Sequence, residues 1–195
     1  KQTFFMNNRN NQAKILRTFR KIHRTMGIFL FVVFLFVSLT GLLLGWKKNT
    51  GGLILPKSYE GTSTVMADWI SVDSLHKNAC RILLDSISPD LSTELERIDL
   101  RPDKGMVKFV FIDNYIGIQL DCATGNLLHI ETRRSDFIEN IHDGSILDYL
   151  FNTKKEQIKL VYTTITGLAL FSFTVTGFWL WYGPKRMRRK GTDLS

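Results

Sequence analysis

Residues 25–46, TMGIFLFVVFLFVSLTGLLLGW, form a run of 22 residues without a charged side chain. A second run of 25, residues 160–184, reads LVYTTITGLALFSFTVTGFWLWYGP. About 20 apolar residues in a helix cross the roughly 30 Å hydrocarbon core of a bilayer, and neither run has the polar face of a soluble helix. The sequence therefore predicts two transmembrane helices, at 25–46 and 158–184. No small-x-small cleavage site follows the first run, so we interpret it as an uncleaved anchor.

Positive charge is concentrated beside these two runs. The chain has a net charge of +8. Residues 1–24 carry seven Lys or Arg and no acid, and residues 185–195 carry five against one acid. Basic flanks of membrane helices are retained in the cytoplasm, so we prefer this interpretation to nucleic-acid binding. We expect both flanks in the cytoplasm and residues 47–157 on the outer side, with membrane lipid around the helices.

The segment between the runs has the pattern of a small α+β domain. After a linker at residues 47–68, Ser71 is suited to be an N-cap, and apolar residues recur at helical spacing until a stop near Pro89. Four strand-like stretches follow, at 97–100, 106–112, 115–121 and 127–132. We predict one helix on an antiparallel sheet within residues 69–134, and an amphipathic connector on the membrane surface at 135–157.

Small residues recur along both predicted membrane helices. Helices in lipid approach closely where side chains are small, and spacings of three, four or seven keep residues on one face. Gly and Thr are also common in membrane helices in general. The predicted packing faces, which favour a homodimer or a larger membrane complex, contain Gly41 and Gly45 in the first helix and Thr163, Gly167, Thr174 and Gly177 in the second.

The outer segment contains the two cysteines of the chain, Cys80 in the predicted helix and Cys122 in the last turn. Disulfides persist outside the cytoplasm, so one interpretation is a disulfide between them. The other is two unpaired small residues in the core. No CxxC or CxxCH motif is present, which gives no support to thioredoxin-like redox chemistry or to covalently attached haem.

Two of the four histidines flank the predicted membrane helices. His23 precedes the first helix on the cytoplasmic side, and His142 precedes the second on the outer side. Each has an ordinary interpretation, as part of a basic flank and as a turn residue. A helix of 22 residues is about 33 Å long, so the two histidines cannot bind the same iron. Neither apolar run, 25–46 or 160–184, contains a charged residue, which gives no support to an intramembrane proton relay.

Several short motifs resemble those of the PepSY-associated transmembrane family of bacterial envelope proteins. Together they extend over most of residues 20–190. They are His23-Arg24-x-x-Gly27 with Ser38-x-Thr40-Gly41, the turn Asp121-x-x-Thr124-Gly125, the sequence Ile141-His142-x-Gly144, and the terminal Val175-Thr176-Gly177-x-x-Leu180-Trp181 before a basic tail. The resemblance implies a periplasmic PepSY domain and a location in the bacterial inner membrane.

That family includes inner-membrane reductases of ferric siderophores, which carry haem between histidines of their membrane helices. The resemblance therefore implies His23 and His142 as axial ligands of b-type haem in a protein of iron acquisition. Imidazole ligands suit haem iron and tune its potential. The larger reductases have four or more membrane helices and this chain has two, so half of the ligands would come from a second copy in a dimer.

The resemblance also allows a function without catalysis. PepSY domains elsewhere act as inhibitory or protein-binding modules. In that case the domain would bind a periplasmic partner, and the two helices would dock on a larger membrane complex.

Overall fold

The computed structural model describes residues 2–112, 114–151, 153 and 156–192. The chain divides into two compact units. One contains the chain up to Leu39 and from Ile141 onward, and the other is Thr40–Asn140. The end of the predicted basic tail, residues 193–195, lies outside the described residues, as does Lys1.

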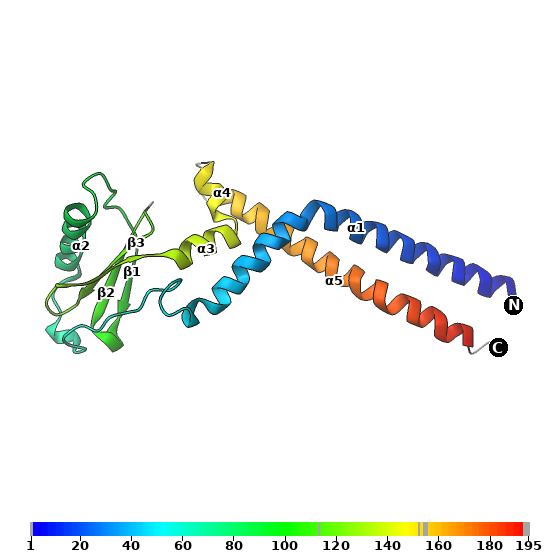
Figure 1. The fold of residues 1–195 in the computed structure, drawn as a ribbon, viewed down its shortest axis with the longest axis horizontal. Helices are drawn as coiled ribbons and strands as arrows, with labels where there is room; N and C mark the ends of the chain where they lie inside the picture. Colours follow the sequence, from blue (N-terminus) through cyan, green and yellow to red (C-terminus); the bar gives the residue numbers. More distant parts are fainter. Residues whose placement is uncertain (1, 113, 152, 154–155, 193–195) are drawn as a thin grey trace. The chain divides into compact units, whose positions relative to one another are not determined.

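Two long helices dominate the first unit, α1 (Gln2–Trp46) and α5 (Gln157–Thr192). Figure 1 shows them in blue and in orange to red. Segments of both are long and apolar enough to cross a membrane. Only 6% of the most apolar window of each is buried, which excludes the core helix of a soluble protein. The prediction of two membrane helices is confirmed, and α1 extends as one helix through the basic segment that precedes the apolar run.

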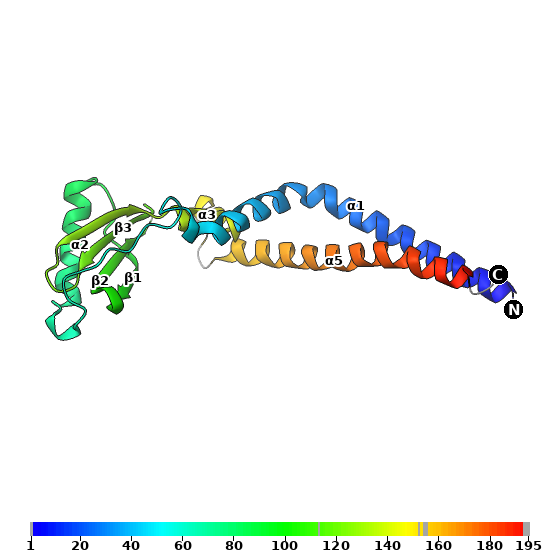
Figure 2. The ribbon, with the colours of Figure 1, turned by 60° about the horizontal axis from the view of Figure 1, so that its bottom comes forward.

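The helices α1 and α5 are antiparallel, so the start of α1 and the end of α5 lie at the same end of the pair (Figure 2). At that end a Cβ on Gly183 would lie 2.6 Å from Leu16 Cδ2, so the helices approach closely. Further along, the rings of Phe34 and Phe173 meet edge to face, with centroids 5.4 Å apart. A small cavity of about 40 Å³ lies beside Leu16, Trp179 and Gly183, where the helices approach closely.

The second unit contains a four-stranded antiparallel sheet in the order β1-β2-β3-β4. The strands are β1 (Leu95–Arg101), β2 (Met106–Phe111), β3 (Ile116–Asp121) and β4 (Leu127–Thr132). The helix α2 (Val72–Ser86) begins at the predicted N-cap, where the Ser71 side chain accepts a hydrogen bond from Ser74 N. The α+β prediction is confirmed.

Helix α2 packs on one face of the sheet. Alternation places every second strand residue on this face, and burying large apolar side chains there supplies the main stabilisation of so small a domain. The buried core consists of Leu75, Ala79 and Leu83 from α2 with Val107, Phe109, Phe111, Ile118, Leu120 and Cys122.

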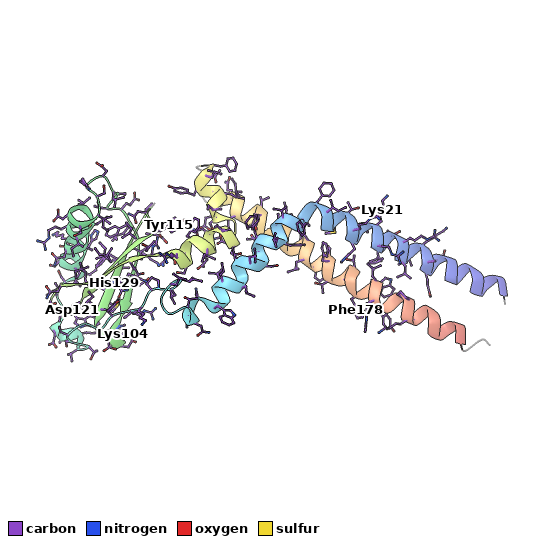
Figure 3. The ribbon with its side chains drawn as sticks, in the orientation of Figure 1. Lys21, Lys104, Tyr115, Asp121, His129 and Phe178 are labelled. Atoms are coloured by element: carbon purple, nitrogen blue, oxygen red, sulfur yellow. The ribbon has the colours of Figure 1, made fainter. Side chains whose placement is uncertain are left out.

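The opposite face of the sheet is covered by part of the segment that the sequence predicted to be a linker. Tyr59 N donates to Gln119 Oε1 at 3.0 Å, and Gln119 Nε2 donates to Lys57 O at 2.9 Å. Lys104, labelled in Figure 3, donates from Nζ to Ser58 O at 2.9 Å. Residues 57–63 are therefore a cover for the sheet.

Two short helices occupy the predicted connector, α3 (Arg134–His142) and α4 (Ser145–Leu150). The start of α3 is attached to the sheet unit. Ser135 N donates to Ile54 O at 3.0 Å, and Asn140 Nδ2 donates to Tyr115 Oη at 2.9 Å. The beginning of the connector thus belongs structurally with the sheet.

Both cysteines are free thiols in the structure, so it forms no disulfide between them. Cys122 is fully buried in the core, and burial raises the pKa of its thiol to about 11. Cys80 is half-buried on α2, with its Sγ 3.2 Å from Nε2 of His76. The structure therefore agrees with the interpretation in which the two cysteines are unpaired.

Candidate functional site

His23 of α1 lies against α5. Its Nδ1 is 2.8 Å from the hydroxyl oxygen of Thr176, which is itself 5% exposed. Its ring packs on the ring of Phe173 with a centroid distance of 4.4 Å. These contacts join residues 153 positions apart in the sequence. The first and last of the motifs that resemble the PepSY-associated transmembrane family therefore meet at this point.

The hydroxyl of Thr176 determines which nitrogen of His23 carries the proton. Thr176 Oγ1 donates its hydrogen to the backbone oxygen of Ser172, 2.7 Å away in the preceding turn of α5. The hydroxyl has one hydrogen to donate, so while that hydrogen goes to Ser172 O the hydroxyl acts towards His23 as an acceptor. Nδ1 of neutral His23 is then the protonated nitrogen, and Nε2 has the free lone pair that binds a metal.

Two glycines border this contact. A Cβ on Gly27 would lie 3.4 Å from Cζ of Phe173, closer than most side chains pack. A Cβ on Gly177 would lie 3.7 Å from Cε1 of His23. Among the described residues, the contacts of His23 are with Thr176 and Phe173, and its Nε2 has no hydrogen-bond partner. The site thus has an oriented imidazole with one unused nitrogen.

His142 is the last residue of α3 and is half-buried. Gly144, two residues further on, has a φ of +82°, and a Cβ there would lie 2.5 Å from the ring of Tyr162 on α5. Tyr162 and Thr176 are 14 residues apart on α5, which corresponds to about 21 Å of helix. His23 and His142 are therefore at different levels of the helix unit and are not brought together within one chain.

Two carboxylates hold the start of α5 near His142. Asp148 accepts hydrogen bonds from Ile158 N at 3.0 Å and Lys159 N at 2.7 Å, two of the amides that begin a helix without an internal partner. Asp143 Oδ2 is 2.9 Å from Lys159 Nζ. Burial alone would raise the pKa of Asp143, but hydrogen bonds from Ser145 together with the hydrogen bond and charge of Lys159 outweigh it and lower the pKa. These contacts are structural, because each carboxylate is used within the chain.

Most of the predicted small packing residues are not used within one chain. Thr163, Gly167 and Thr174 are exposed, and within the part of the chain that the structure describes the two hydroxyls bond only to backbone oxygens of their own helix. Gly45 and Gly167 have open space where a Cβ would lie. Gly41 is half-buried, and Gly177 is beside His23. The exposed part of this set leaves a face of α5 open to lipid or to another chain.

The Asp121-x-x-Thr124-Gly125 motif forms the turn between β3 and β4. The Asp121 carboxylate accepts from Ala123 N at 2.9 Å and from the hydroxyls of Thr124 and Thr62, each at 2.8 Å. Gly125 has a φ of +73°, where a side chain would be strained. Burial alone would raise the pKa of Asp121, but the hydrogen bonds outweigh it and lower the pKa. The motif thus has a structural role.

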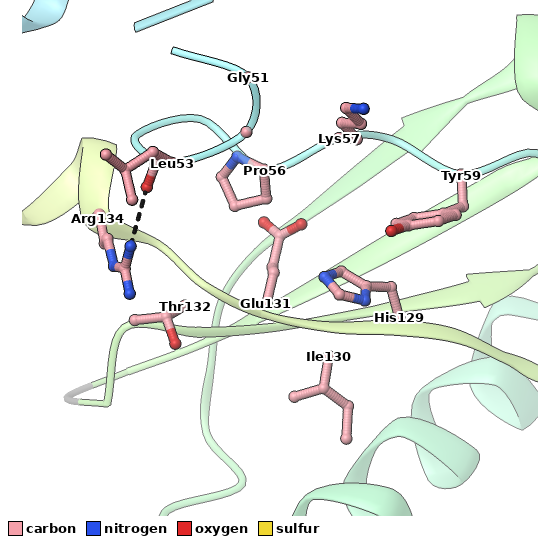
Figure 4. A pocket seen from close by; sticks show the side chains of 11 residues that line it. Gly51, Leu53, Pro56, Lys57, Tyr59, His129, Ile130, Glu131, Thr132 and Arg134 are labelled. Carbon is pink, nitrogen blue, oxygen red and sulfur yellow. Dashed lines mark hydrogen bonds between the residues drawn. The ribbon is translucent and has the colours of Figure 1, made fainter.

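The sheet unit has a separate groove along its edge strand β4, with a volume of about 380 Å³ (Figure 4). The ring of Tyr59 packs on that of His129 with centroids 4.8 Å apart. Glu131 is 3% exposed, 3.1 Å from Lys108 Nζ, and also bonded to Gln119. The lining residues are Gly51, Gly52, Leu53, Pro56, Lys57, Tyr59, His129, Ile130, Glu131, Thr132 and Arg134.

The partners of His23 and this groove were not predicted from the sequence. Thr176 was noted only as part of a motif, because no periodicity links positions in two distant helices. The groove forms where residues 51–59 lie beside β4, and such long-range contacts leave no local pattern.

No match was found among curated proteins or among solved structures. The model of the PepSY-associated TM region matches residues 20–194, which include both long helices and the whole sheet unit. The motifs that meet at His23, the turn at Asp121 and the two membrane helices on either side of an α+β domain agree with this match. The chain is a membrane protein and belongs to the PepSY-associated TM family.

Proposed function

We propose that this protein serves bacterial iron acquisition by passing electrons through b-type haem across the inner membrane to a periplasmic ferric chelate. His23 and His142 would each provide one axial ligand, and a second copy of the chain would provide the other. Haem bound in this way supplies one-electron transfer. In this arrangement the basic ends lie in the cytoplasm and the sheet unit lies in the periplasm.

The observation that carries the proposal is the orientation of His23. Metal-binding histidines usually donate from the other ring nitrogen to a fixed acceptor, which sets the tautomer and holds the ring. Thr176 provides such an acceptor at 2.8 Å from Nδ1. Phe173 packs on the imidazole and limits its rotation. The residues of the site therefore suit a ligand of haem iron.

The separation of the two histidines along α5 favours two sites per dimer. About 21 Å of helix divides the levels at which His23 and His142 lie. Each site then needs the same residue from a partner, which a twofold axis along the membrane normal would provide. The exposed Thr163, Gly167 and Thr174 face of α5 offers a surface for that association.

The visible spectrum of the detergent-purified protein tests this function. The oxidised protein should have a Soret band that sharpens on reduction with dithionite, with separate α and β bands. His23→Ala and His142→Ala should each reduce the bands, whereas His129→Ala in the sheet unit should leave them unchanged. A preparation that remains colourless after haem is added would overturn the proposal.

A second candidate function is that of an accessory subunit, and the groove along β4 favours it. An edge strand presents unpaired backbone groups on which an extended segment of a partner can pair. Under this proposal the protein binds no haem, and the sheet unit holds a periplasmic partner. Co-purification of a stoichiometric partner by the colourless protein, lost when β4 is blocked by Leu128→Pro, would support this function over electron transfer.

A further inference from the structure

We propose that the groove along β4 binds a phosphate group, and that its source is the headgroup of an anionic phospholipid. The inference is independent of haem. It rests on the charge of the groove, on its backbone and on its attachment to the end of the first membrane helix.

The groove has an excess of positive charge. Lys57 and Arg134 line it, and neither has an acidic partner within 4.0 Å in the part of the chain that the structure describes. Arg134 donates one hydrogen bond, from Nη1 to Leu53 O at 3.3 Å, and has further donors to offer. The acid of the groove, Glu131, is already neutralised by Lys108 behind it. An anion entering the groove therefore meets two cations that have no counter-charge.

The backbone of the groove at Gly51 and Gly52 permits a ligand to approach closely. Gly51 and Gly52 have φ values of +64° and +97°, a conformation that glycine adopts without strain. Neither has a side chain, so a ligand can contact the main chain directly. The Arg134 and Leu53 side of the groove lies opposite the side formed by Tyr59 and His129 in Figure 4. A volume of about 380 Å³ is within the range of small-ligand sites.

Chain connectivity places the groove near the membrane. Gly51 follows Trp46, the last residue of α1, by only five residues, which span at most about 17 Å. Thr50 Oγ1 accepts from Ile54 N at 3.1 Å and donates to Lys47 O at 2.9 Å. Ile54 O in turn accepts from Ser135 N, next to Arg134. The groove is thus fastened to the end of the helix.

Two more cations lie at that end of α1, Lys47 and Lys48. Neither has an acidic partner among the described residues. Lysines on the outer flank of a membrane helix oppose the usual charge distribution, so a local role explains their presence better than orientation does. Basic residues beside a membrane attract anionic lipid headgroups. This favours a lipid headgroup over a soluble phosphate compound as the source.

The test uses the full-length protein in a zwitterionic detergent and isothermal titration with three probes. These are dihexanoyl-phosphatidylglycerol, dihexanoyl-phosphatidylcholine and inorganic phosphate. The variant is Lys57→Gln with Arg134→Gln. The control is Arg81→Gln with Arg101→Gln, which removes the same charge from exposed positions outside the groove. We expect phosphatidylglycerol to bind, and the groove variant to lose about tenfold or more in affinity while the control keeps it.

Each outcome decides the proposal. Tighter binding of phosphatidylglycerol than of inorganic phosphate, lost only in the groove variant, supports both the site and its lipid source. Equal binding of inorganic phosphate, lost in the same variant, supports the phosphate site and overturns the lipid source. Equal affinities in wild type and groove variant, equal loss in groove and control variants, or no binding of either anion would overturn the site. None of these results depends on haem.

Discussion

His23 illustrates how one hydroxyl can prepare an imidazole for a metal. The hydroxyl of Thr176 has its hydrogen engaged with Ser172 O, so only its lone pairs face His23 Nδ1. A neutral histidine in water prefers to carry its hydrogen on Nε2, which would leave the wrong nitrogen free. We expect the contact with Thr176 to reverse this preference, and the reversal can be measured in the absence of any metal.

The prediction concerns Thr176→Val, which keeps the shape of the side chain and removes the acceptor. Nitrogen-15 NMR of histidine-labelled protein should show the Nδ1–H tautomer for His23 in the wild type and a shift towards Nε2–H in the variant. Thr174→Val is the matched control, because Thr174 bonds only to Leu170 O of its own helix. An Nε2–H tautomer in the wild type would contradict the account of the site.

Glu131 is a second residue whose role can be measured, through the effect of its substitution on the free energy of unfolding. Its carboxylate is buried beside Lys108 and Gln119 on the covered face of the sheet. In Glu131→Ala both partners lose one acceptor, so Lys108 retains only Asp99 at 3.6 Å and Gln119 Nε2 only Lys57 O. Breaking a buried ion pair costs about 3–5 kcal/mol, and we expect roughly 2–3 kcal/mol because the Lys108 side chain is 20% exposed.

The measurement is urea unfolding followed by the fluorescence of Trp69, which packs on the core of the sheet unit, with the other tryptophans replaced by Phe. Glu60→Gln is the control, because Glu60 is exposed. Equal stability of Glu131→Ala and the control would show that the covered polar face does not contribute to stability.

At the scale of elements, α3 is held on the sheet by a charged network. Asp136 accepts from Arg133 Nη1 at 2.7 Å and from Arg97 Nη2 at 2.9 Å, and Glu96 pairs with both arginines. Burial alone would raise the pKa of Asp136, but the hydrogen bond from Arg97 and the charge of Arg133 outweigh it. The pKa is therefore below its ordinary value of 3.8.

This lowered pKa predicts a dependence of stability on pH. A carboxyl with a lower pKa in the folded state stabilises fully above its unfolded value, and the contribution is lost as pH falls through the folded value. The wild type should therefore lose stability in the Trp69 assay between about pH 4.5 and pH 2.5. Asp136→Asn should be less stable at pH 6 and depend less on pH in that window. An identical pH dependence of Asp136→Asn and Asp85→Asn, an exposed control, would contradict the role of the network.

The elements of the sheet unit could be predicted because their patterns are local. Ser71 as N-cap, the helical spacing after it and the four alternating stretches each involve neighbouring residues. The covered face could not be predicted, because Lys108, Gln119 and Glu131 alternate with apolar residues as they would on a strand that faces water. Their burial results from residues 57–63, whose composition favours a linker. The contact of His23 with Thr176 could not be predicted either, because the two residues are 153 positions apart along the chain.

At the scale of the whole molecule, the chain leaves apolar surface on both membrane helices. Large apolar residues such as Phe29, Leu42, Leu168 and Phe171 are each more than 60% exposed. In a membrane protein this surface contacts lipid or another helix. Each histidine of the proposed haem sites is also a single ligand within its own chain. The proposed electron transfer therefore needs the dimer, and the dimer fixes how much haem the protein can hold.

The haem content of the purified protein is the measurement that tests this account most directly. Two His23 residues would share one haem and two His142 residues the other, so the pyridine haemochrome assay should give one b-type haem per chain. His23→Ala and His142→Ala should each give half of that content, and the double variant none. Wild-type protein without haem after reconstitution, or undiminished haem in the double variant, would contradict the account.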